Sequence, residues 1–116
     1  MRNVQFYRTQ TGRSPVEDFL SSLSGPQAAK IAWVLQLVED LDTIPRQYFK
    51  KLTNTDEIWE TRVQVGRNTF RLLGFFDGSK LVILNHAFAK KSQKIPKSEI
   101  TIAEQRKRDY FRRKRK

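Results

Sequence analysis

The segment that most constrains the fold is a predicted hairpin over residues 59–73, with a tight turn at residues 65–68. Gly66 is the first loop residue, and glycine there suits a type II′ turn, whose twist matches that of two antiparallel strands. A two-residue loop sets Val63 opposite Phe70 on an apolar face. Because a slip of one residue would move these side chains to the other face, the register is strongly specified.

The opposite face of the same hairpin is polar. The predicted register places Arg62 directly across from Arg71, with Glu60 as a neighbour. Two like charges in an antiparallel pair destabilise it, so a carboxylate such as Glu60 or a bound anion should offset them. Two converging guanidinium groups form a phosphate site. The alternative is that both arginines splay apart into solvent.

A second turn at residues 77–78 precedes a strand predicted over residues 81–88. A loop of two or four residues would put His86 on the face of Arg62 and Arg71, whereas a loop of three would put it on the other face. Neighbouring cations would lower the pKa of the imidazole and favour its neutral form, which can accept a proton from a ribose hydroxyl. The alternative is a structural or merely exposed histidine.

The segments outside this region predict one further strand and three helices. Alternation over residues 3–7 predicts a short strand, and Ser-Pro at the start of residues 14–25 is typical of a helix start. An apolar stripe over residues 26–42 predicts a second helix. A last helix is predicted over residues 96–111, whereas residues 48–52 fit either a helical turn or an extended arm.

This order of elements predicts an α+β fold. A small, antiparallel-rich twisted sheet, formed by the N-terminal strand and a three-stranded meander, packs against an N-terminal helical hairpin, and a C-terminal helix follows. Residues 1–111 are predicted to form a single domain. Residues 112–116 are predicted to be a basic, disordered tail, because a run of cations has no apolar surface to bury.

Charge is distributed unevenly along this basic chain, whose formal net charge is +11. Residues 1–85 hold 11 Lys and Arg against 9 Asp and Glu, whereas residues 86–116 hold 12 against 3. Such a field attracts polyanions, nucleic acid foremost, although a solvated tail that only aids solubility is the alternative.

The lack of cysteine excludes disulfides and thiolate metal sites and fits a cytoplasmic protein. No apolar run predicts a membrane span, and no spacing predicts a metal site.

Several of these segments are similar to one known family. Residues 59–63, 70–73, 77–78 and 81–96 resemble the RelE/ParE toxin superfamily, most closely its HigB-like, phage-type branch. The Phe-x-Lys-Lys-x-x-Lys-x-Pro segment that ends at Pro96 is the most specific part. The resemblance implies a RelE-like fold and a toxin of a type II toxin–antitoxin system. Most such toxins are ribosome-dependent messenger RNA endonucleases (mRNA interferases), which cleave by attack of a 2′-hydroxyl on the adjacent phosphate without metal or cofactor.

The resemblance also implies roles for individual residues. Arg71 matches the strand arginine that binds the scissile phosphate, Arg62 matches a basic position next to it, and Lys91 matches the basic residue after the last strand. Glu60 stands where RelE has a lysine, and the tyrosine of RelE has no counterpart, so either Glu60 or His86 is the expected base. Lys91 or Lys94 would assist the leaving group. The predicted RNA- or phosphate-binding residues are Lys90, Lys94, Lys51 and Lys97.

Two other functions remain open at this point. One is a ParE-like toxin that inhibits DNA gyrase, and the other is a non-catalytic, basic nucleic-acid-binding module. The crowded polar face favours the endonuclease. The expected partners are a cognate antitoxin, HigA-like with a helix-turn-helix domain, and the ribosome with messenger RNA in its A site; no membrane partner is expected.

Overall fold

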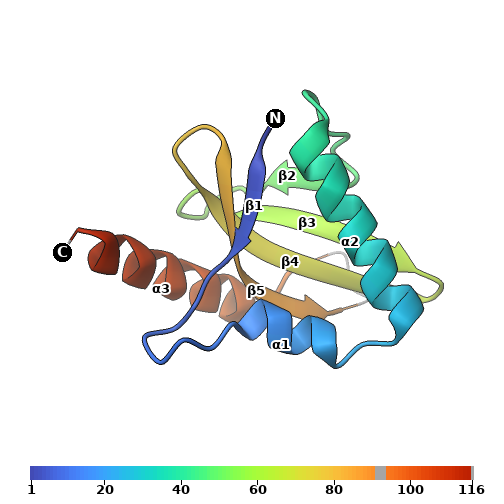
Figure 1. The fold of residues 1–116 in the computed structure, drawn as a ribbon, viewed down its shortest axis with the longest axis horizontal. Helices are drawn as coiled ribbons and strands as arrows, with labels where there is room; N and C mark the ends of the chain where they lie inside the picture. Colours follow the sequence, from blue (N-terminus) through green and yellow to red (C-terminus); the bar gives the residue numbers. More distant parts are fainter. Residues whose placement is uncertain (91–93, 116) are drawn as a thin grey trace.

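The fold is α+β, as predicted (Figure 1). The computed structural model describes residues 1–90 and 94–115, and within these the chain forms a five-stranded mixed sheet and three helices. The elements are β1 (Asn3–Phe6), α1 (Pro15–Ser21), α2 (Gly25–Asp40), β2 (Phe49–Lys51), β3 (Trp59–Val65), β4 (Asn68–Asp77), β5 (Leu81–Ala89) and α3 (Lys97–Lys114). The strand order is β1-β5-β4-β3-β2.

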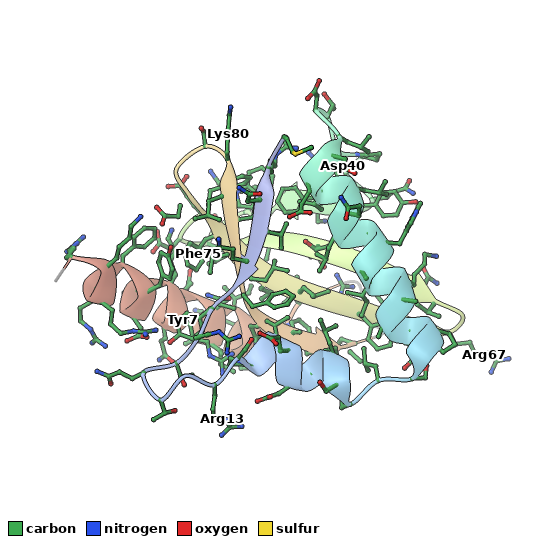
Figure 2. All side chains as sticks on the ribbon, in the orientation of Figure 1. Tyr7, Arg13, Asp40, Arg67, Phe75 and Lys80 are labelled. Atoms are coloured by element: carbon green, nitrogen blue, oxygen red, sulfur yellow. The ribbon has the colours of Figure 1, made fainter. Side chains whose placement is uncertain are left out.

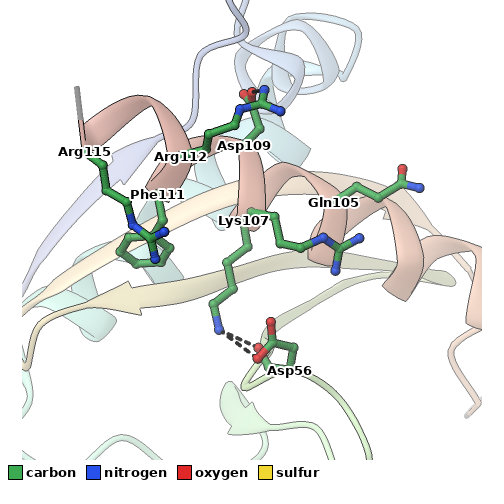
Figure 3. Close-up of a pocket in the computed structure, with 8 residues that line it drawn as sticks. Asp56, Gln105, Lys107, Asp109, Phe111, Arg112 and Arg115 are labelled. Atoms are coloured by element: carbon green, nitrogen blue, oxygen red, sulfur yellow. Dashed lines mark hydrogen bonds and ion pairs between the residues drawn. The ribbon is translucent and has the colours of Figure 1, made fainter.

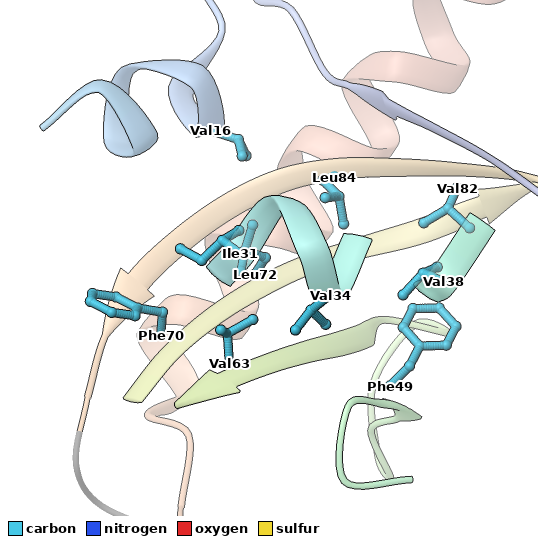
Figure 4. Packing of buried hydrophobic residues seen from close by; sticks show 10 residues of the cluster. All are labelled: Val16, Ile31, Val34, Val38, Phe49, Val63, Phe70, Leu72, Val82 and Leu84. Atoms are coloured by element: carbon cyan, nitrogen blue, oxygen red, sulfur yellow. The ribbon is translucent and has the colours of Figure 1, made fainter. Parts of the chain in front are cut away.

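Helices cover both faces of the sheet (Figure 1). Helices α1 and α2 pack on one face, where Ile31, Val34 and Val38 of α2 meet Val63 and Leu72 of the strands (Figure 4). Helix α3 packs on the opposite face through two smaller clusters. The hairpin residues predicted to be apolar therefore face α1 and α2, and the polar face predicted around Arg62 is the one that α3 partly covers.

Both N-terminal helices begin at serine caps. The Ser14 hydroxyl accepts a hydrogen bond from the Glu17 backbone N–H at 3.2 Å, but the Glu17 carboxylate pairs with Arg8 rather than completing a capping box. At α2 both bonds of the capping box form between Ser24 and Gln27. Such caps satisfy N–H groups that the first turn leaves without partners, which is why short local patterns predict helix starts well.

The predicted hairpin register is confirmed. Arg62 pairs with Arg71 and Val63 with Phe70, and Gly66 has a φ of 59°, as the first loop position of a type II′ turn requires. Strand β1 runs parallel to β5, and the other neighbouring strands are antiparallel. The ambiguous segment around Phe49 is the short edge strand β2, which adds a fifth strand to the four predicted.

Two irregularities between β4 and β5 decide which way His86 points. Asp77 pairs with Leu81, so the loop has three residues, the length that would send His86 to the opposite face. A register shift between Leu73 and Gly74 reverses the alternation, and Leu73 then pairs with His86. A bulge inserts one residue into one strand. His86 therefore lies on the Arg62 and Arg71 face, by a route that the sequence did not predict.

The C-terminal helix is longer than predicted. It continues to Lys114, so residues 112–114, which were predicted to belong to a basic tail, are helical in the structure. Ion pairs stabilise the last turn of the helix: Arg113 binds Asp109 at 2.8 Å, and Lys114 binds Asp77 of β4 at 2.6 Å.

The single-domain assignment of residues 1–111 stays a prediction. No helix among the described residues is long and apolar enough to cross a membrane.

Candidate nucleic-acid interface

A buried ion pair links β3 and β4. The Glu60 carboxylate accepts a hydrogen bond from Nη1 of Arg71, and both side chains are only 1% exposed. Glu60 lies opposite Leu73, two residues from Arg71 on the neighbouring strand, so the two side chains are diagonal neighbours on one face. This pair therefore offsets the repulsion between Arg62 and Arg71 across the hairpin. Of the two explanations that the sequence offered, the neighbouring carboxylate is the one formed.

Arg62 carries the positive charge that the Glu60 carboxylate does not neutralise. It is half-buried, and among the residues that the structure describes no carboxylate forms an ion pair with it. Its Nε atom is buried without a hydrogen-bond partner. A buried N–H that makes no hydrogen bond costs about 1–3 kcal/mol. Among the described residues the Glu60 carboxylate thus pairs with Arg71 and not with Arg62, and a bound anion would neutralise Arg62.

Polar residues continue this face toward the β3–β4 turn. Gln64 pairs with Thr69 across the hairpin, and the Lys90 backbone N–H donates to the Thr69 carbonyl at 3.0 Å. Lys90 is exposed, and Arg67 in the turn extends away from the body of the molecule (Figure 2). We call this strip the arginine face. It consists of Arg62, Gln64, Thr69, Arg71 and Lys90.

Access to the arginine face is uneven. Arg71 is predicted to hold a phosphate, yet it is buried beside Glu60. The cations open to a ligand are Arg62, in part, and Lys90. If a phosphate bound here as predicted, it would meet Arg62 first and would compete with Glu60 for Arg71.

His86 lies on the same side of the sheet, but its partners come from α3. Its Nε2 lies 2.9 Å from Oε1 of Glu99, and its Nδ1 lies 3.4 Å from Nη1 of Arg106, which also donates to the Asn85 carbonyl at 2.7 Å. Burial lowers the pKa of the imidazole, Glu99 opposes this, and Arg106 adds to the lowering. A neutral ring that donates from Nε2 and accepts at Nδ1 satisfies all of these contacts.

The sequence did not identify the partners of His86. Glu99 and Arg106 are seven residues apart, which places them on one side of a helix two turns apart. This spacing indicates that Glu99 and Arg106 could contact a common partner, but no pattern in the neighbouring sequence indicates that the partner lies on β5. As placed, His86 holds α3 against the sheet, and both ring nitrogens are engaged.

The predicted lysines are dispersed. Lys51 lies on the edge strand β2 and pairs with Glu57 at 3.6 Å, so it does not join the arginine face. Lys97 is the exposed first residue of α3, and Lys94 is exposed shortly before it. Lys91 lies outside the described residues. Among the described residues, no group of three or more His, Cys, Asp or Glu side chains could hold a metal ion.

Fold and site together define a small, basic α+β protein that carries opposed arginines on one face of a mixed sheet. Residues 18–108 match the model of a family described as phage-derived, Gp49-like proteins (DUF891). The chain belongs to this family. Membership is consistent with a toxin of the toxin–antitoxin type. No curated protein matches the chain.

Proposed function

We propose that this protein is the HigB-like toxin of a type II toxin–antitoxin system and acts as a ribosome-dependent messenger RNA endonuclease. One observation carries the proposal: Arg62 and Arg71 oppose each other, and Glu60 neutralises only one of them. The remaining guanidinium, Arg62, is half-buried and has no ion-pair partner among the described residues, which suits a phosphate oxygen. Membership of the Gp49-like family supports the toxin assignment.

The proposed reaction is an internal transfer of the phosphoryl group. The ribose 2′-oxygen forms a bond to the adjacent phosphorus, and the bond from phosphorus to the 5′-oxygen breaks. A base takes the proton of the 2′-hydroxyl, and the departing 5′-oxygen gains one, which leaves a 2′,3′-cyclic phosphate and a 5′-hydroxyl. In this proposal Arg62 and Arg71 stabilise the charge that develops on the phosphate oxygens.

Glu60 is the proposed proton acceptor. Both ring nitrogens of His86 are engaged by α3, whereas the Glu60 carboxylate lies among the arginines. A phosphate that draws Arg71 away would release this carboxylate as it arrives, which couples substrate binding to activation of the base. Lys91, outside the described residues, and Lys94 are proposed to assist the leaving group.

Other lysines and partners complete the proposal. Lys90 and Lys97 would bind the phosphates of the flanking RNA. Lys51 could bind a phosphate only after its ion pair with Glu57 breaks. The ribosome would present messenger RNA in its A site. A cognate HigA-like antitoxin with a helix-turn-helix domain would cover the arginine face and neutralise its charge.

The test is cleavage of messenger RNA on translating ribosomes, with the new ends mapped by primer extension. We expect cuts in phase with codons, and a loss of about 10²–10³-fold in rate for Arg62→Gln, the magnitude typical of a group that stabilises transition-state charge. Arg13→Gln is the matched control, because Arg13 is exposed and precedes α1 on the other side of the sheet. Intact message together with gyrase-dependent DNA damage would instead support a ParE-like toxin.

The base is tested by the pH dependence of the cleavage rate. If Glu60 accepts the proton, Glu60→Gln should lower the maximal rate and remove the acidic limb of the profile, and His86→Gln should retain that limb. The reverse pattern would assign the proton transfer to His86. Circular dichroism of both variants verifies that they are folded.

A further inference from the structure

A hollow lies on α3, lined mostly by residues of that helix (Figure 3). It has a volume of about 730 Å³ and lies between the helix and the loop that precedes β3. The arginine face lies toward the other end of β3, near the hairpin turn. The residues that line the hollow are Asp56, Gln105, Lys107, Arg108, Asp109, Phe111, Arg112 and Arg115.

Three arginines of the hollow form a stripe along the helix. Arg108, Arg112 and Arg115 are spaced four and three residues apart, so they share one side of α3 and span about 10 Å at 1.5 Å per residue. All three are exposed, and among the described residues neither Arg108 nor Arg115 has an ion-pair partner. Arg112 pairs with Asp109, yet 69% of its side chain remains exposed.

The acidic residues of the hollow do not neutralise this stripe. Lys107 donates to the Asp56 carbonyl at 2.6 Å and lies 3.4 Å from its carboxylate (Figure 3). Asp109 accepts from the Tyr7 hydroxyl and also binds Arg113. Asp56 serves Lys107, and Asp109 is divided between Arg112 of the stripe and Arg113 outside it, so the three arginines keep a net positive field.

We propose that this stripe, Arg108, Arg112 and Arg115, is a second site that binds the sugar–phosphate backbone of an RNA strand. Guanidinium forks match phosphate oxygens bidentately, and a line of them at helical spacing can follow successive phosphates. Phe111 lines the same hollow and offers an aromatic surface on which an unpaired base can stack.

The helix that carries the stripe is held rigidly. Asp77 of β4 accepts hydrogen bonds from Tyr110 and Lys114, and Arg106 donates to the Asn85 carbonyl of β5. A site on an anchored helix loses little freedom when it binds, so few contacts suffice. The stripe would hold RNA at a distance from the arginine face and so fix the direction in which the strand enters it.

The choice of RNA as ligand rests on the proposed function, but binding is measured without cleavage. The probe is a fluorescein-labelled 2′-O-methyl RNA of about 20 nucleotides, longer than common single-strand sites, whose blocked nucleophile prevents the reaction. Its binding is followed by fluorescence anisotropy over a series of salt concentrations. The triple variant removes the stripe: Arg108→Gln, Arg112→Gln and Arg115→Gln. The control removes the same charge from exposed positions elsewhere: Arg13→Gln, Arg46→Gln and Lys80→Gln.

We expect the stripe variant to bind the RNA about 30-fold more weakly and to lower the slope of log K against log salt by about 2, at roughly 0.7 per phosphate contact of a single strand. The control should change both quantities far less. Equal losses in the two variants would overturn the site, because net charge alone would then explain them. Competition by polyglutamate as effective as that by unlabelled RNA would overturn it in favour of an acidic protein.

Failure of this inference is distinguishable from failure of the proposed function. If messages stay intact on ribosomes while the stripe variant still loses RNA binding, the endonuclease proposal fails and the second site stands. If messages are cut but the stripe variant binds the RNA normally, the second site fails alone.

Discussion

Replacing Glu60 by alanine should destabilise the protein more than any surface substitution on the sheet. Glu60 and Arg71 are each 1% exposed and hydrogen-bonded to each other. Breaking a buried ion pair by removing one partner costs about 3–5 kcal/mol. Arg62 lies directly across from Arg71 and would then repel it without the intervening carboxylate, so we expect about 4 kcal/mol.

The assay is urea unfolding followed by tryptophan fluorescence, since Trp59 is next to Glu60 on β3. A loss of that size corresponds to a fall in Tm of about 15 °C for a chain of this length. Glu60→Gln is the control, because its amide oxygen still accepts from Arg71, and it should cost less. A double variant with Glu60→Leu and Arg71→Met replaces both charges by apolar groups and should recover most of the loss.

The reasoning about this pair fails if Glu60→Ala loses less than about 1 kcal/mol, the value of an exposed ion pair. It also fails if the double variant loses as much stability as the Glu60→Leu and Arg71→Met single variants lose in sum. Additivity would mean that Glu60 and Arg71 do not interact.

Three further substitutions test other parts of the structure by urea unfolding. Burial lowers the pKa of His86 from its ordinary value of 6.5. As the pH falls below that value, the imidazole is protonated in the unfolded chain but stays neutral in the folded one, and this favours unfolding. Stability should therefore decline from about pH 7 to pH 5 and do so less in His86→Gln; equal slopes would contradict this. Gly74→Ala would place a Cβ 2.2 Å from the Ile83 carbonyl oxygen and should unfold the sheet, so a variant that stays folded would contradict the packing. Ser24→Ala removes the hydroxyl that accepts from the Gln27 backbone N–H in the capping box and should cost about 1 kcal/mol, whereas exposed Ser21→Ala should cost little.

Local patterns in the sequence predicted much of the architecture. The register of the Arg62 and Arg71 hairpin follows from a two-residue turn at Gly66 and from the alternation on either side of it. The start of α1 follows from its Ser14 cap, and α2 was predicted from the apolar stripe over residues 26–42. In each case the deciding interactions lie within a few residues, so side-chain size, polarity and backbone freedom at neighbouring positions suffice to indicate them.

The environment of the polar side chains could not be read in the same way. The parallel pairing of β1 with β5 joins segments nearly 80 residues apart. His86 reaches the arginine side only because a register shift compensates for a three-residue loop. Its partners belong to α3, and the burial of Arg71 with Glu60 depends on how the layers pack. Alternation assigns a side chain to a face, but whether that face meets water, a helix or a counter-ion depends on contacts between distant segments.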